Sequence, residues 1–215
     1  MAASPIRFVL DGRVDVQDDA SNPQETVLDR LRGPYGRTGT KEGCAEGDCG
    51  ACTVLLGELD GDGVKWRAVN SCILFVPMLD GKAVLTVESL ARDGVLHPVQ
   101  RAMADGHGSQ CGFCTPGFVM SLVGRSMGAS GTEGVAVKDV IAGNLCRCTG
   151  YGPILEAGEA NPPAPRDDAR TAELLRSIQP TATQGRNWFK PRTSDALAAL
   201  LVGHPDARIV AGATM

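Results

Sequence analysis

The chain has 215 residues, of which 43% are hydrophobic, and its formal net charge is -4. This length and composition suffice for ordinary hydrophobic cores in one or two domains. The acidic balance argues against a general nucleic-acid surface, and no apolar run approaches the roughly 18 residues that a membrane span needs.

The N-terminal segment does not have the pattern of a signal peptide. Asp11, Arg13 and Asp15 come before any hydrophobic region develops. We therefore expect a cytoplasmic protein. In such a reducing compartment, eight cysteines at metal-ligand spacings indicate metal centres more than disulfides.

The chain is predicted to open with a β-hairpin and a helix. Residues 6–10 and 13–16 flank the two-residue turn Asp11-Gly12. The helix is expected to start at Asn22, an N-cap followed by Pro23, and to end at Gly33.

Three further strands are expected, over residues 53–59, 64–69 and 83–87, the first two joined by Asp60-Gly61-Asp62-Gly63. Two strands, a helix and then more strands make a small α+β unit. The order is typical of the ubiquitin-like, β-grasp fold of plant-type ferredoxins.

A first group of four cysteines lies in this part of the chain. Three of them follow C-x4-C-x2-C with a fourth downstream, which is the plant-type spacing for one [2Fe-2S] cluster. Zinc sites favour paired C-x2-C knuckles and fit this spacing less well. The predicted ligands are Cys44, Cys49, Cys52 and Cys72. Interleaved glycines at 43, 47 and 50 let the backbone wrap closely and direct N–H groups at sulfur.

From about His97 the hydrophobic period becomes helical. His97-Pro98 is expected to open one helix, and Thr115-Pro116 to cap another that carries Val119, Leu122, Val123 and Met127. A third pattern runs through residues 137–141. These helices predict a compact all-α bundle.

A second group of four cysteines belongs to this helical part. It combines C-x-x-C with C-x-C, a spacing that suits a second [2Fe-2S] cluster but leaves a closed zinc site open as an alternative. The predicted ligands are Cys111, Cys114, Cys146 and Cys148.

The last part of the chain begins with a segment rich in proline and charge, residues 161–168, which is typical of a linker. A short helix is expected at about residues 169–178 and another at 194–202. Residues 208–211 are predicted to form a strand that runs into a small-residue turn, like the opening of another domain.

No Ser-His-Asp, Cys-His or paired-carboxylate set stands out, so no catalytic residue is assigned. The three histidines, His97, His107 and His204, are not needed as ligands beside eight cysteines. Arg147 is read as a solvated or ion-paired side chain, and Trp188 with Phe189 as anchors on a neighbouring domain.

Three motifs resemble one known family. KEGCAEGDCGACTV (41–54), GSQCGFCTPGF (108–118) and GNLCRCTGYGPI (143–154) are similar to the iron-sulfur segment of the molybdenum hydroxylases, the xanthine dehydrogenase and aldehyde oxidase family. The similarity spans residues 5–160 and is strongest to the small subunit of the bacterial xanthine dehydrogenases. Residues 189–215 resemble the beginning of the family's FAD-binding domain.

The resemblance implies an electron relay. A molybdopterin centre on a separate large subunit oxidises a purine such as xanthine, and electrons pass through the cluster of the helical domain, then the plant-type cluster, to FAD and NAD. By the same resemblance, Gln110 and Cys148 contact the molybdopterin. We therefore expect a hetero-oligomer in which the catalytic site lies on a partner, with no nucleic-acid or membrane partner.

The flavin part departs from the family. The family's loop AGGTD is AGATM here, with Gly212, Ala213 and Thr214 as the expected pyrophosphate contacts. FAD is expected to bind only if a flavin domain or subunit completes this start. The expected organisation is a plant-type ferredoxin domain (1–90), a helical [2Fe-2S] domain (91–160), a linker (161–187) and an incomplete FAD-binding domain (188–215).

Two alternatives remain. The partner could oxidise aldehydes, carbon monoxide or N-heterocycles instead of purines. In a different class, the chain would be a zinc-stabilised interaction module with no redox role.

Overall fold

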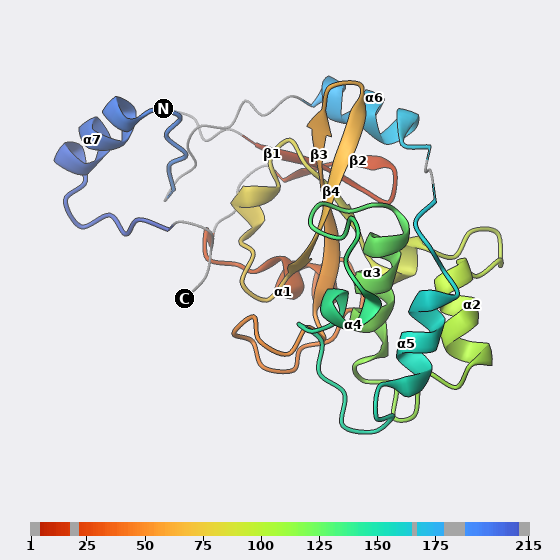
Figure 1. Ribbon diagram of the computed structural model, residues 1–215. Coiled ribbons are helices and arrows are strands. Elements are labelled where there is room, and N and C mark those ends of the chain that lie inside the picture. The colour runs from red at the N-terminus through yellow and green to blue at the C-terminus, as the bar shows by residue number, and fades with distance from the viewer. Residues whose placement is uncertain (1–4, 18–21, 165–166, 179–187, 211–215) are drawn as a thin grey trace.

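A computed structural model describes residues 5–17, 22–164, 167–178 and 188–210 (Figure 1). Its first part is a mixed five-stranded sheet in the order β2-β1-β5-β3-β4, in which β1 and β5 are parallel and the other pairs are antiparallel. This is the predicted β-grasp arrangement. The strands are β1 (Ile6–Leu10), β2 (Arg13–Gln17), β3 (Thr53–Asp60), β4 (Gly63–Asn70) and β5 (Ala83–Leu85).

Two tight turns set the register of the hairpins. Asp11 and Gly12 have φ angles of 53° and 70°, the left-handed pair that a two-residue turn between twisted strands requires. The β3–β4 ladder extends to the pair Asp60↔Gly63. The expected four-residue connection is therefore only the two residues Gly61 and Asp62.

Alternation along the strands gives the sheet two apolar faces. One face packs with α1 in a core that comprises Ile6, Phe8, Leu10, Val27, Leu31, Val54, Leu56, Val76, Leu79 and Val84. The opposite face contributes Val9, Leu55, Trp66, Ala83 and Leu85 to a larger core shared with the helices that follow. The sheet and the helical part are thus joined by one continuous apolar interior.

Helix α1 (Val27–Arg32) begins later than predicted. Its N-cap is Thr26, whose Oγ1 accepts from Asp29 N at 3.0 Å, whereas Asn22 forms a local turn with Gln24 N. The prediction was wrong because Thr26 bridges to Phe75 in an extended conformation, which fixes the backbone before Val27. The helix ends at Gly33, as expected.

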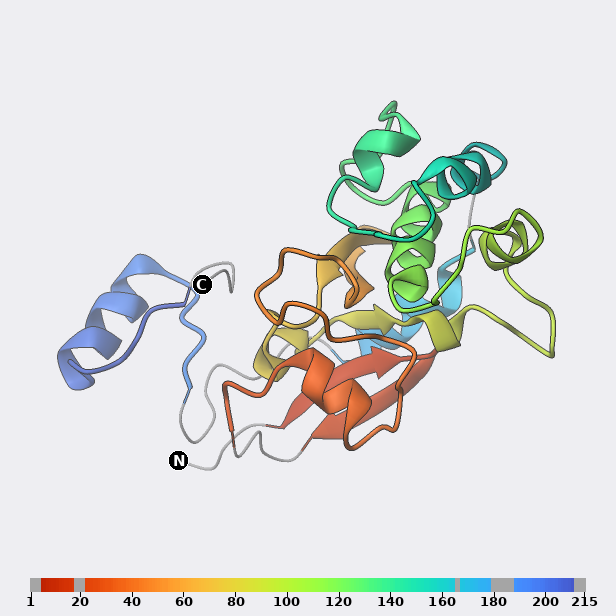
Figure 2. The ribbon, with the colours of Figure 1, turned by 90° about the horizontal axis from the view of Figure 1, so that it is seen from below.

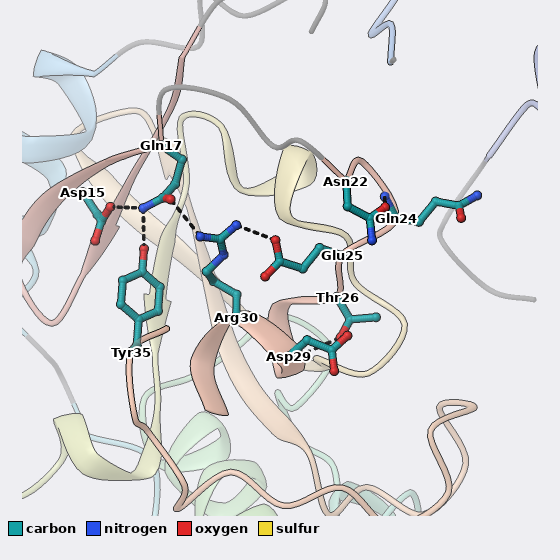
Figure 3. A network of polar contacts seen from close by, with 9 residues as sticks. All are labelled: Asp15, Gln17, Asn22, Gln24, Glu25, Thr26, Asp29, Arg30 and Tyr35. Atoms are coloured by element: carbon teal, nitrogen blue, oxygen red, sulfur yellow. Dashed lines mark hydrogen bonds and ion pairs between the residues drawn. The ribbon is translucent and has the colours of Figure 1, made fainter. Parts of the chain in front are cut away.

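A polar network fastens α1 to the first hairpin (Figure 3). Gln17 Nε2 donates to Asp15 Oδ1 at 2.6 Å and to the Tyr35 hydroxyl at 2.8 Å, while Arg30 donates to Gln17 Oε1 at 3.0 Å and pairs with Glu25. Burial raises the pKa of Tyr35, and the hydrogen bond with Asp15 raises it further. The Tyr35 hydroxyl therefore stays protonated in this network.

The second part of the chain is a group of helices on one face of the sheet (Figure 2). Helix α3 is almost entirely buried and packs on β3 and β4. It starts at Thr115 as predicted, but Cys114, not Thr115, is its N-cap. The helix after the C-x-C was not predicted. The helices are α2 (Pro98–Asp105), α3 (Thr115–Ser126), α4 (Val137–Val140) and α5 (Gly152–Glu159).

Helix α6 (Ala169–Ser177) lies inside the segment expected to be a linker, and it packs against the sheet. Leu175 is buried in the core that α3 shares with the sheet, and the indole N–H of Trp66 donates to Asp168 Oδ2 at 2.9 Å. The segment therefore covers part of the sheet as well as connecting the regions on either side.

Helix α7 (Ser194–Gly203) forms as predicted and lies apart from the sheet in both views (Figures 1 and 2), with no buried residue. Trp188 packs against the α1 side of the sheet, and the Phe189 ring lies 4.6 Å from that of His204. Residues 208–210 are not a strand, because no neighbouring strand pairs with them in the described chain. The remaining residue of that prediction, Ala211, lies outside the described residues.

The two short 3-10 helices, Val76–Leu79 and Val87–Ser89, flank β5. Among the described residues, no helix is long and apolar enough to cross a membrane.

Candidate metal centres

Two cysteines of the first group are held at one end of the sheet. Cys52 immediately precedes β3 and Cys72 follows β4, and Thr53 pairs with Asn70 across these strands. Ser71 ties the two positions together, since its Oγ donates to Cys52 O at 2.7 Å. Both cysteines are buried, with exposures of 2% and 7%.

The other two cysteines of this group lie in the glycine-rich loop before β3. The N–H groups of Asp48 and Cys49 each donate to Cys44 Sγ at 3.3 Å. A side chain at Gly43 would not fit, because its Cβ would lie 2.7 Å from Cys49 Sγ. The backbone thus wraps the sulfurs closely, in the manner that the interleaved glycines predicted.

The surroundings lower the pKa of one thiol of this group, Cys44, and raise the pKa of another, Cys72. Burial opposes ionisation of Cys44, but backbone N–H donors from Glu46, Cys49 and Asp48 outweigh it and lower its pKa to about 7. Burial raises the pKa of Cys72 to about 12, and the neighbouring Cys52 thiol adds to this effect. Donors that stabilise a thiolate also stabilise the negative charge of a thiolate-ligated cluster.

The second group of cysteines lies in two segments that precede helices. Cys111 and Cys114 come before α3, and Cys146 and Cys148 lie between α4 and α5. Cys111 and Cys148 are exposed, and their sulfurs are 3.6 Å apart. Cys114 and Cys146 are partly buried and interact with each other.

Donors also surround this second group. Burial opposes ionisation of Cys146, but the Thr149 hydroxyl and N–H, at 3.2 Å and 3.5 Å from its sulfur, outweigh it and lower its pKa. Burial, followed by the Cys146 thiol, raises the pKa of Cys114 to about 12. The Tyr151 hydroxyl accepts from Cys146 N at 2.9 Å and holds this loop on the helices.

Each group is arranged as two pairs of thiols. Cys44 interacts with Cys49 and Cys52 with Cys72 in the first group, and Cys111 with Cys148 and Cys114 with Cys146 in the second. Within the described chain, no three His, Cys, Asp or Glu side chains converge on a position for one metal ion. A [2Fe-2S] cluster has two irons with four cysteine ligands, so paired thiols fit it better than a mononuclear zinc site.

The two groups meet at a junction that the sequence analysis missed. Leu145 N donates to Cys49 O at 3.0 Å, which joins the first group to the residue before Cys146. The buried Asn144 side chain donates to Gly50 O at 3.0 Å. Nothing in the cysteine spacing points to either contact; the one sequence signal is a polar residue two positions before the C-x-C.

The other residues singled out from the sequence lie in varied places. Gln110 and Arg147 are exposed beside the second group. His97 is the N-cap of α2, with Nδ1 accepting from Val99 N at 3.2 Å, and His107 is exposed. The expected flavin contacts Gly212, Ala213 and Thr214 lie outside the described residues.

Two family models match the chain. A 2Fe-2S iron-sulfur cluster binding domain matches residues 9–76, and a [2Fe-2S] binding domain matches residues 86–159. With two groups of four paired thiols in the same two regions, the fold and the sites define a protein with two [2Fe-2S] domains.

Solved structures with the same fold include the quinoline 2-oxidoreductase of Pseudomonas putida 86. It is 32% identical with a TM-score of 0.58, and the match covers 82% of this chain and 98% of that chain. The aldehyde oxidoreductase of Desulfovibrio gigas is 30% identical with a TM-score of 0.60, over 82% of this chain and 18% of that one.

Curated relatives include the xanthine dehydrogenase of Emericella nidulans, 46% identical over 72% of this chain and 11% of the relative. Aldehyde oxidase 2 of Cavia porcellus is 45% identical over 70% of this chain and 12% of its own length. The xanthine dehydrogenase/oxidase of Rattus norvegicus is 34% identical over 100% of this chain and 20% of its own length. The chain belongs to the xanthine dehydrogenase and aldehyde oxidase family, and it spans about a tenth to a fifth of these relatives.

Proposed function

We propose that this chain is the electron-transfer part of a molybdenum hydroxylase. One [2Fe-2S] cluster is held by Cys44, Cys49, Cys52 and Cys72, and a second by Cys111, Cys114, Cys146 and Cys148. The observation that carries the proposal is the pairing of four thiols in each of the two regions that match [2Fe-2S] domains. When bound, the clusters supply one-electron transfer.

The contribution of the chain's own residues is to hold and tune this charge. The N–H groups of Asp48 and Cys49 aim at Cys44, and the Thr149 hydroxyl and N–H aim at Cys146. Such donors raise a cluster's potential by stabilising its reduced, more negative form. Burial of Cys52 and Cys72 shields that side of the first group from water, while Cys44 and Cys49 are partly exposed.

Exposure supports a direction for the relay. The second group lies open at Cys111 and Cys148, with Gln110 exposed beside them, so a molybdopterin on a large partner subunit can approach it. Electrons would enter there, pass to the first group, and leave toward FAD and NAD on a flavin domain or subunit. The assembly would be a cytoplasmic hetero-oligomer of the bacterial xanthine dehydrogenase type.

The proposed organisation keeps the predicted ranges: a plant-type ferredoxin domain over 1–90, a helical domain over 91–160, a linker over 161–187 and the start of a FAD-binding domain over 188–215. The two family matches fall inside the first two ranges to within a few residues.

We propose a purine, xanthine converted to urate, as the substrate of the whole enzyme, because several similar relatives are named xanthine dehydrogenase. Relatives named for aldehydes and quinoline favour the alternatives of an aldehyde or N-heterocycle substrate. A carbon monoxide substrate has no such support among these relatives. In each of these alternatives the substrate would bind on the partner subunit.

EPR of the dithionite-reduced chain at two temperatures, with iron and zinc quantified on the same sample, tests the proposal. Two distinct signals with iron for two [2Fe-2S] clusters are expected. Zinc in place of iron would refute the electron-transfer function and favour the interaction module. One signal alone would confine electron transfer to one region.

A further inference from the structure

Asn144 is a buried polar side chain where the two cysteine groups meet. It is 4% exposed and lies two residues before Cys146. A buried amide of this kind is stable only when its donors and acceptor are satisfied. The partners of its hydrogen bonds therefore show which segments of the chain Asn144 connects.

All three hydrogen bonds of the Asn144 side chain reach other segments of the chain. Its Nδ2 donates to Gly50 O at 3.0 Å and to Thr53 Oγ1 at 3.3 Å, and its Oδ1 accepts from Ser121 Oγ at 2.7 Å. Gly50 and Thr53 belong to the first ligand loop and the start of β3, and Ser121 belongs to α3. The one side chain thus connects the first ligand loop, the sheet and the central helix.

The contacts around it are close. Leu145 N donates to Cys49 O at 3.0 Å, so the ligand residues Cys49 and Cys146 are linked through one hydrogen bond and one intervening residue. Gly117 of α3 leaves no room for a Cβ against Gly50 O. A shift of Asn144 would therefore move the Leu145 contact and the spacing of the two ligand groups together.

We propose that Asn144 is a positioning residue that sets the distance between the two [2Fe-2S] clusters and thereby the rate of electron transfer between them. The inference rests on the ligand assignment given under the proposed function. With both clusters bound, the step concerned would be a one-electron transfer from a reduced second cluster to an oxidised first cluster, so no bond would form or break and Asn144 itself would not be oxidised.

The test uses the full chain with clusters. Asn144→Leu removes all three hydrogen bonds at similar size, and Asn144→Asp keeps the acceptor for Ser121 but loses the donor to Gly50. Asn161→Leu is the matched control, because Asn161 also donates to a backbone carbonyl, Ala157 O at 2.8 Å, but at the end of α5. Each protein is assayed for iron, for spin-spin interaction of the two reduced clusters by EPR, and for intercluster transfer by rapid-freeze EPR.

Both Asn144 variants are expected to keep two clusters, to show weaker spin-spin broadening, and to transfer electrons several-fold more slowly, because the electronic coupling between two redox centres falls steeply with their separation. Asn161→Leu should leave transfer and broadening unchanged. A merely structural role would lower thermal stability without moving these two signals.

Unchanged transfer in both Asn144 variants with clusters intact would overturn the inference. So would loss of clusters from both variants, because Asn144 would then be needed for assembly and not for spacing. If only Asn144→Leu fails to take up both clusters, the transfer rate and the broadening of Asn144→Asp decide between the outcomes. Wild-type protein without two clusters would refute the proposed function itself, which separates the two failures.

Discussion

The two cysteine groups differ in the structures that hold them. The first is built at the end of a sheet, with Cys52 and Cys72 buried and the other two thiols wrapped by a glycine-rich loop. The second lies in loops that precede helices, with Cys111 and Cys148 exposed. The same four-thiol set is thus half buried in one region and half exposed in the other. The first group is the better shielded from water, and the second is the more open to contact from outside the chain.

The largest expected effect tests whether the two regions hold their clusters independently. Cys148→Ser should halve the iron content and remove one EPR signal, because serine replaces a thiolate ligand at an exposed position. The remaining signal should be that of the first cluster. Cys72→Ser should remove the signal of the first cluster and leave that of the second. Loss of both clusters from Cys148→Ser would break the comparison, since the regions would then assemble as one unit.

The next effect tests burial around the first group. Leu28 is 2% exposed and packs with Cys52 and Cys72, so Leu28→Ala should lower the free energy of unfolding by about 2–5 kcal/mol. Phe113, near the second group, is 48% exposed, and Phe113→Ala should change the free energy of unfolding by less than about 0.5 kcal/mol. Chemical denaturation of the cluster-loaded chain measures both. Similar losses in the two variants would contradict the contrast.

A smaller effect tests the close contact between the regions. Gly117→Ala should destabilise the chain by about 1–3 kcal/mol, because its Cβ would overlap Gly50 O, although alanine normally favours a helix. Gly143→Ala is the control: no atom lies within 4 Å of its Cβ, and a gain of about 0.4–1 kcal/mol is expected. Thermal unfolding compares the two variants. A stabilised Gly117→Ala would show that the regions do not touch as described.

The smallest effect concerns the ion pair of Glu58 and Lys82, which lies on the sheet away from both cysteine groups. It gives a reference value for a stability change that involves neither group. The hydrogen bond from Lys82 lowers the pKa of Glu58 by more than burial raises it. The pair therefore stabilises the folded state at pH values above the unfolded pKa of about 4.3. This stabilisation is lost as the pH falls through the lowered pKa of the folded state. Glu58→Gln should cost less than about 1 kcal/mol at neutral pH, because the pair is partly exposed. A cost that persists below the lowered pKa, in unfolding curves across pH, would contradict this.

Local signals predicted much of the fold. The turn Asp11-Gly12, the alternating strands and the end of α1 at Gly33 depend on residues close in the chain, and they were confirmed. The start of α1 was wrong because the bridge from Thr26 to Phe75 is a contact between distant segments. Propensity within a window cannot include such a contact.

The candidate sites were predictable to a different degree. Cysteine spacing alone separates two groups of four, and the structure brings each group together as pairs. Spacing does not show which thiols pair, or that Asn144 and Leu145 join the groups. Those features depend on how α3 docks on the sheet, which involves residues far apart in the chain.

Helix α6 has a practical consequence for anyone who would prepare this protein in pieces. The family match ends at residue 159, and a fragment cut there would lack Ala172 and Leu175, which are 0% and 1% exposed. The apolar surface that they cover, around Trp66, would face water and favour aggregation. A fragment that ends after Ile178 keeps this surface covered, so we expect the smallest soluble piece with both cysteine groups to extend beyond the end of the second family match.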